Sequence, residues 1–125
     1  MKNLKLDTGV VSYQIGQGVL QFNPADPNVY IRLQQAMDKL EDMEKSLQSQ
    51  LQEKSVLSIM ADMDKALKAQ LGWVFGPGND FDAICGGMNL LSADAKGVRL
   101  ISKLFETLEP VLLEGAKQCA STMDN

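Results

Sequence analysis

The stretch from Asn28 to Leu71 contains no glycine or proline, and this limits most strongly how the chain can fold. Within and just beyond it, apolar side chains recur every three or four residues. They form one series of Leu33, Met37, Leu40, Met43, Leu47 and Leu51, and a second of Val56, Met60, Met63, Leu67, Leu71 and Val74. This spacing is that of amphipathic helices, which need neighbours to cover their apolar sides.

Capping residues divide this stretch into two helices. Asp26 followed by Pro27 predicts a helix start, because Asp accepts hydrogen bonds from the first turn and Pro has no amide to leave unpaired. We expect this helix to end near Glu53 or Lys54, and Ser55 to cap the next. The sequence therefore predicts an antiparallel helical pair over 27–72, with a single long rod as the alternative.

Residues 1–23 predict a β-hairpin. Apolar and polar side chains alternate there, and the apolar parity set is Val11, Tyr13 and Ile15. Gly16-Gln17-Gly18 reads as a three-residue loop, after which β-branched and aromatic residues resume, and an earlier turn is expected at 7–9. A lone hairpin is unstable in water, so its apolar side should cover helices.

The segment 73–97 predicts a glycine-rich loop with one short helix. Asp80 is placed to cap a helical turn over Phe81 to Cys85, which Gly86-Gly87 would end. We expect Leu90 and Leu91 to point inward from the loop that follows.

A last helix is predicted over 98–120, with an unusually broad apolar face. Its members are Val98, Leu100, Ile101, Leu104, Phe105, Leu108, Val111 and Leu112. Such a width indicates either the central helix of the fold or one that also meets a partner. Pro110 should kink this helix near Glu106 or split it. The predicted fold is thus mostly α (α+β), in a single domain over 1–125.

Composition disfavours catalysis and binding to nucleic acid or membrane. The chain has no histidine, the commonest general base and metal ligand. Its 12 Lys and Arg against 16 Asp and Glu give a net charge of -4, which repels phosphate backbones and anionic lipids. No apolar run approaches the ~20 residues that span a bilayer, and the start lacks a signal-peptide pattern. We expect a cytoplasmic protein that is not an enzyme.

No metal or cofactor motif is present. Cys85 and Cys119 stand far apart without a C-x-x-C, and we expect two reduced thiols. In Asn79-Asp80-Phe81-Asp82, a calcium loop would need further alternating oxygen ligands and a closing glutamate, which are missing. We predict capping and turn roles instead. A histidine-free enzyme is the alternative, in which Asp80 and Asp82 converge in one pocket.

Four of the seven methionines lie on the two helical stripes: Met37, Met43, Met60 and Met63. Flexible thioethers fill irregular gaps in a core, and they also line surfaces that grip varied partners. Both interpretations are open from the sequence.

The C-terminal half resembles a known family. Trp73-Val74-Phe75-Gly76-Pro77-Gly78-Asn79-Asp80 leads to Ile84-Cys85-Gly86-Gly87-Met88-Asn89, and Gly97-Val98 precedes Leu104-Phe105-Glu106-Thr107-Leu108-Glu109-Pro110-Val111-Leu112. This order is similar to the C-terminal block of the tail assembly chaperones of long-tailed bacteriophages and prophages of Gram-positive bacteria. The likeness covers roughly a third of the chain.

The resemblance implies a non-enzymatic role in the cytoplasm of a bacterial host. Such chaperones bind the tape-measure protein, keep its long apolar helical surface in solution and recruit tail-tube subunits. A longer frameshifted product often accompanies the short one. The oligomeric state is open, with a homo-oligomer as one option.

We predict partner binding at large apolar residues beside the glycines: Trp73, Phe75, Phe81 and Ile84. The alternative is that this segment plugs the base of the core. Two other functions stay open. One is a small structural or adaptor component of a phage or prophage particle, and the other is a secreted helical-hairpin protein with a Trp-x-Gly turn.

Overall fold

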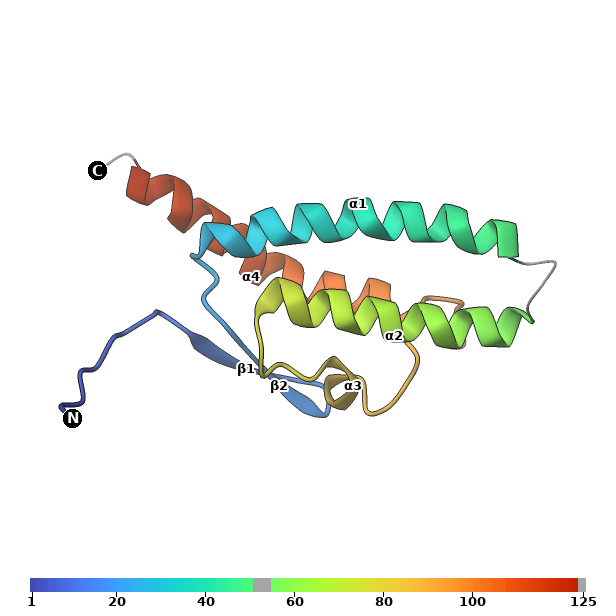
Figure 1. Ribbon diagram of the computed structural model, residues 1–125, viewed down its shortest axis with the longest axis horizontal. Coiled ribbons are helices and arrows are strands. Elements are labelled where there is room, and N and C mark those ends of the chain that lie inside the picture. The colour runs from blue at the N-terminus through green and yellow to red at the C-terminus, as the bar shows by residue number, and fades with distance from the viewer. Residues whose placement is uncertain (51–54, 124–125) are drawn as a thin grey trace.

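The computed structural model describes residues 1–50 and 55–123, without the side chain of Leu47. In chain order the elements are β1 (Val11–Ile15), β2 (Gly18–Phe22), α1 (Pro27–Gln50), α2 (Val56–Phe75), α3 (Phe81–Ile84) and α4 (Leu100–Met123) (Figure 1). The predicted mostly helical α+β fold is confirmed.

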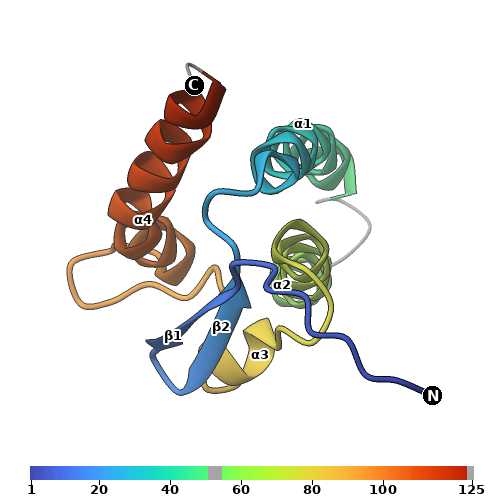
Figure 2. The same cartoon turned by 90° about the vertical axis from the view of Figure 1, so that its left-hand side faces the viewer.

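Helices α1 and α2 run antiparallel, side by side (Figures 1 and 2), so the single-rod alternative is wrong. Both predicted starts are correct. The Asp26 carboxylate accepts a hydrogen bond from the Asn28 amide at 3.0 Å, and the Ser55 hydroxyl accepts one from the Ser58 amide at 3.2 Å. The predicted end of the first helix, at Glu53 or Lys54, lies outside the described residues.

Helix α2 continues through Phe75, so the predicted boundary at residue 72 is wrong. Gly72 is helical, and the helix ends only at Gly76, whose φ is 112° and whose amide donates to the Gly72 carbonyl at 3.0 Å. A glycine inside a helix costs about 1 kcal/mol. Burial of Val74 and Phe75 on the inner face outweighs that cost, because a large buried apolar side chain contributes about 1.5–3 kcal/mol.

The hairpin is tighter than predicted. Its strands are antiparallel, with Tyr13 opposite Leu20 and Ile15 opposite Gly18, so Gly18 belongs to β2 and the turn has two residues rather than three. Gly16, with φ of 56°, supplies the positive φ that such a turn requires at its first position.

An aromatic series joins the hairpin to the helices. The Phe22 and Phe75 ring centroids are 4.8 Å apart in an edge-to-face arrangement, and those of Phe75 and Phe81 are 5.8 Å apart. The hairpin also approaches α3 closely, since a Cβ atom on Gly18 would lie 2.9 Å from the Ile84 amide nitrogen. The apolar side of the hairpin thus covers α2 and α3.

The outer edge of β2 is closed by a side chain. The Asn79 Oδ1 accepts from the Gln21 amide at 2.8 Å, and its Nδ2 donates to the Gln21 carbonyl at 2.9 Å. The same Nδ2 lies 3.1 Å from the Gly76 carbonyl oxygen. Asn79 therefore stands where a neighbouring strand would pair, and it fastens the end of α2 to the hairpin.

Helix α4 begins at Leu100 and ends at Met123, not at 98 and 120 as predicted. Residues 98 and 99 are held in the preceding loop instead, because Ala93 and Arg99 form an antiparallel bridge and the Leu100 amide donates to the Ser92 carbonyl at 2.8 Å. Val98 is consequently exposed rather than on the apolar stripe. The helix continues through Pro110, so the split is wrong, and the alternative kink near Glu106 stays a prediction.

Helix α4 is attached to the start of α1 through polar contacts. The Tyr30 hydroxyl lies 2.7 Å from the Pro24 carbonyl oxygen and 2.8 Å from that of Leu112. The Cys119 thiol donates to the Ala25 carbonyl at 3.0 Å. Gly115 leaves room for this contact, because a Cβ atom there would lie 2.7 Å from the Pro24 carbonyl carbon. Burial raises the pKa of Tyr30, with a smaller effect from the neighbouring Cys119.

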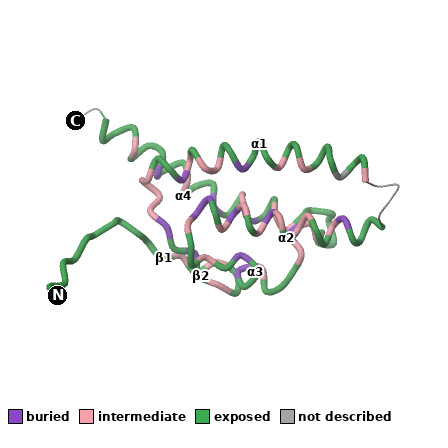
Figure 3. The backbone as a smooth tube through the Cα atoms, viewed as in Figure 1, coloured by how far each residue is buried: buried purple, intermediate pink, exposed green. Residues whose placement is uncertain are grey.

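In Figure 2, α2 lies between α1 above it and α3 below it, while α4 stands to one side with the hairpin below. Buried residues gather where these elements meet (Figure 3). The fully buried ones include Leu20, Leu90 and Leu108. Among residues 1–50 and 55–123, no helix combines the length and the apolar character needed to cross a bilayer.

Candidate functional site: an apolar groove between the helices

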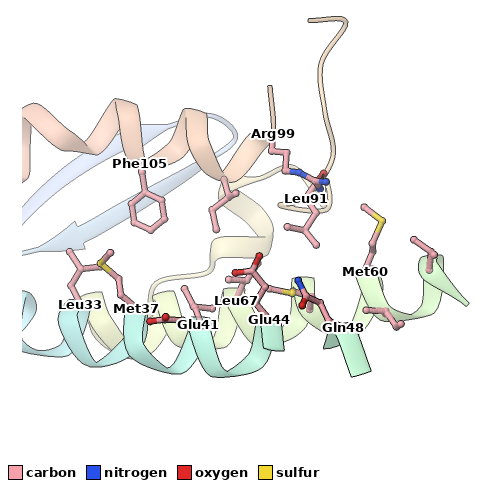
Figure 4. A pocket seen from close by; sticks show the side chains of 15 residues that line it. Leu33, Met37, Glu41, Glu44, Gln48, Met60, Leu67, Leu91, Arg99 and Phe105 are labelled. Atoms are coloured by element: carbon pink, nitrogen blue, oxygen red, sulfur yellow. Dashed lines mark hydrogen bonds between the residues drawn. The ribbon is translucent and has the colours of Figure 1, made fainter. Parts of the chain in front are cut away.

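An open hollow of about 750 Å³ lies between α1, α2 and the start of α4 (Figure 4). In the part of the chain that the structure describes, three elements and one loop supply its walls, and most of the side chains are aliphatic, thioether or aromatic. The lining residues are Leu33, Met37, Leu40, Glu41, Glu44, Gln48, Val56, Ile59, Met60, Met63, Leu67, Leu91, Arg99, Ile101 and Phe105. This is the size of a cleft that binds ligands or peptide side chains.

The helical stripes produce this hollow because each helix turns only part of its apolar face to its neighbour. Leu67 is buried between α1 and α2, whereas Met37 keeps 55% of its surface exposed. From α4, Phe105 points across the opening toward Leu33 and Met37 (Figure 4). The splayed position of α4 leaves these side chains partly uncovered.

The far end of the hollow is shaped by the loop before α4. The Asp64 carboxylate accepts from the Leu90 amide at 2.7 Å, and the Asn89 side-chain amide donates to the Met60 carbonyl at 3.1 Å. These bonds fix the loop on α2, bury Leu90 and turn Leu91 into the hollow, which confirms that both leucines point inward.

A largely buried lysine supports the same loop. Lys68 Nζ lies 2.8 Å from Asp64, 2.6 Å from Asp82 and 2.9 Å from the Met88 carbonyl oxygen. Burial by itself lowers the pKa of Lys68, but the hydrogen bonds to the two carboxylates outweigh it, and the pKa is raised. The ammonium group thus stays charged and ties α2, α3 and the loop together.

A second hollow of about 500 Å³ continues along α4. It is lined by Tyr30, Ser102, Phe105, Glu106, Glu109, Leu112, Leu113 and Ala116. Phe105 lines both hollows, so they meet at its ring. We refer to the two together as the α1–α4 groove.

The predicted partner-binding residues do not line this groove. Phe75, Phe81 and Ile84 are buried in the core under the hairpin, which agrees with the alternative that their segment plugs the core. Only Trp73 is accessible, with 43% of its surface exposed, and its ring centroid lies 5.1 Å from the Lys39 Nζ. Partner binding at Trp73 stays a prediction.

The carboxylates near α3 do not converge. Asp80 caps α3 by accepting from the Ala83 amide at 3.1 Å, as predicted, and Asp82 pairs with Lys68. Neither carboxylate lines either hollow of the groove. Within the described ranges, no three His, Cys, Asp or Glu side chains are grouped so as to hold a metal ion.

The methionine pattern was the best sequence signal for the groove. Met37, Met60 and Met63 line it, and the apolar stripe of the last helix contains Ile101 and Phe105. Leu91 was predicted only to point inward, and Arg99 had no signal, because their places in the groove depend on how the loop returns to α2.

Comparison of the chain with family models, with curated proteins and with solved structures finds no match.

Proposed function

We propose that this chain is a non-enzymatic tail assembly chaperone of a long-tailed phage or prophage. In this role it binds the tape-measure protein, keeps that protein's apolar helical surface in solution in the host bacterial cytoplasm, and helps recruit tail-tube subunits. The observation that carries the proposal is the α1–α4 groove, which is apolar, open and lined by three methionines. The order of motifs from Trp73 to Leu112 resembles that of this family and supports the choice of a tail assembly chaperone.

The groove fits a role in reversible holding. An apolar contact contributes about 25 cal/mol per Å² that it removes from water, so covering about 400 Å² contributes about 10 kcal/mol before ordering costs are subtracted. Those costs take up much of this amount, which leaves an affinity that a later assembly step can reverse. Methionine side chains adapt to different neighbours, as an extended partner with varied side chains requires.

The test is co-expression with the tape-measure protein of the same phage, followed by measurement of how much of that protein stays in the supernatant. Met37→Glu should abolish the effect, because it places a charge at the groove. Met88→Glu is the matched control, since Met37 and Met88 are both 55% exposed and Met88 does not line the groove.

Two results would contradict the proposal. One is tape-measure protein that stays insoluble with the wild-type chain, and the other is an equal loss of solubility with both variants. Recovery of the chain in purified phage particles would favour the structural or adaptor role instead, because an assembly chaperone leaves before the tail is complete.

A further inference from the structure

The charged side chains that line the α1–α4 groove are mostly negative. Among the residues that the structure describes, its lining contains four carboxylates, Glu41 and Glu44 on α1 and Glu106 and Glu109 on α4, but one cation, Arg99. The Arg99 guanidinium already donates to the Leu91 carbonyl at 2.8 Å. The apolar floor is therefore bordered on both flanking helices by negative charge.

The four carboxylates are available to a partner. All four residues are exposed, and none forms an ion pair with another residue in the described parts of the chain. On each helix the two glutamates are three positions apart, so they lie on the same face, one turn from each other. Like charges placed this way repel one another, and a cationic partner would relieve that repulsion.

The shape of the groove fits a helix. Between Ile101 and Ala116, α4 lines both hollows, a span of about 22 Å at 1.5 Å per residue. A helix of about four turns has this length, and an amphipathic helix lying in an apolar groove between helices is a common mode of recognition. Phe105, which lines both hollows, lies about 6 Å from the Ile101 end of this span and would contact the first third of such a helix.

We propose that the α1–α4 groove binds an amphipathic helix of a partner protein whose apolar stripe is flanked by lysine or arginine. This rests on the proposed function and specifies the chemistry of the segment that is held. A second copy of the chain is a poorer occupant, because the net charge of the chain is -4 and its acidic groove would meet another acidic surface.

The experiment uses two labelled peptides of about 18 residues with the same leucine and methionine stripe. One has lysines beside the stripe, and the other has glutamates at those positions. Binding to the full chain is measured by fluorescence anisotropy, at low salt and at about 0.5 M NaCl. The basic peptide should bind at least tenfold more tightly at low salt, and the difference should shrink at high salt.

Charge variants test whether the groove is responsible. Glu41→Gln with Glu44→Gln should weaken binding of the basic peptide about threefold, and adding Glu106→Gln with Glu109→Gln should bring the loss to about tenfold. The matched control is Asp38→Asn with Asp42→Asn, which removes two charges from the same helix at exposed positions outside the groove. This control variant should weaken binding of the basic peptide by less than half as much as the Glu41 and Glu44 variant does.

Equal binding of both peptides would overturn the proposal, as would equal effects of the groove and control variants. Dimers in analytical ultracentrifugation that the basic peptide dissociates would assign the groove to a second copy instead. The two hypotheses fail separately. Selective binding of the basic peptide without solubilisation of the tape-measure protein would reject only the phage function, and solubilisation without charge selectivity would reject only the basic helix.

Discussion

Gly115→Ala is the substitution for which helix propensity and this tertiary structure predict opposite changes in the free energy of unfolding. In a helix interior, alanine is about 1 kcal/mol more favourable than glycine. At position 115 the added Cβ would overlap the Pro24 carbonyl oxygen and the Tyr30 hydroxyl oxygen, and would lie 2.7 Å from the Pro24 carbonyl carbon. Backbone atoms cannot yield as a flexible side chain does, so α4 must move away from α1.

The magnitude follows from three effects. Overpacking in a well-packed site costs about 1–3 kcal/mol, and displacement of the Tyr30 hydroxyl loses a hydrogen bond of about 1 kcal/mol. The gain in helix propensity offsets about 1 kcal/mol of this. We therefore expect Gly115→Ala to lower the free energy of unfolding by about 1–3 kcal/mol.

Gly72→Ala is the matched control. Gly72 also lies inside a helix, but a Cβ atom there would meet only the Asn79 carbonyl oxygen at 3.8 Å, which is ordinary contact. Propensity then decides, and the free energy of unfolding should rise by about 0.5–1 kcal/mol. Both variants are measured by urea denaturation followed by circular dichroism at a helical wavelength, with unfolding treated as two-state.

A Gly115→Ala variant as stable as the wild type would refute this reasoning. A double-mutant cycle gives a second check, because Tyr30→Phe removes one of the overlapping atoms. The combined loss with Gly115→Ala should be at least about 0.5 kcal/mol smaller than the sum of the two single losses. Additive losses would mean that the two positions do not contact each other.

Three further predictions concern other parts of the fold. Asn79→Asp keeps the oxygen that accepts from the Gln21 amide but removes the donor, so urea denaturation should show a loss of about 1–3 kcal/mol. Phe75→Ala should cost about 3–5 kcal/mol because Phe75 is only 4% exposed, and Trp73→Ala should cost half of that or less, as judged by thermal melting. The hydrogen bond from Lys103 lowers the pKa of the Asp94 carboxyl from 3.8 to about 2, and hydrogen bonds from the Val98 and Lys96 amides contribute to this shift. An NMR titration of the Asp94 carboxyl carbon should report this value.

The lowered pKa of Asp94 has a definite consequence for stability. A carboxylate whose pKa is lower when folded stabilises the fold at pH values above its unfolded pKa. This contribution should be complete above pH 4 and should be lost as the pH falls toward 2. Asp94→Asn should remove this part of the acid dependence, and an unchanged dependence between pH 4 and 2 would contradict the assignment. An Asn79→Asp variant with the same free energy of unfolding as the wild type would contradict the prediction for Asn79. A Trp73→Ala variant that loses as much stability as Phe75→Ala would contradict the prediction for Phe75 and Trp73.

Local chemistry was enough to predict the elements themselves. The period of the apolar residues, Asp26 with Pro27, and Ser55 predict where α1 and α2 begin, because a cap involves only neighbouring residues. The hairpin followed in the same way from alternation and from Gly16, whose positive φ is a property of one residue. The capping of α3 by Asp80 was predictable for the same reason, because it involves only neighbouring residues.

Contacts between distant residues decided the rest. Glycine at 72 predicted the end of α2, but burial of Val74 and Phe75 in the core, with Phe75 against Phe22 of the hairpin, extended the helix to Phe75, since packing outweighed the local cost. The same packing buried three of the four residues predicted to bind a partner. The groove exists because α4, held at Gly115 and by the loop fixed to Asp64, leaves part of its own stripe and those of α1 and α2 uncovered. Periodicity states which side of a helix is apolar, whereas only the placement of the neighbouring helices determines which part of that side stays open.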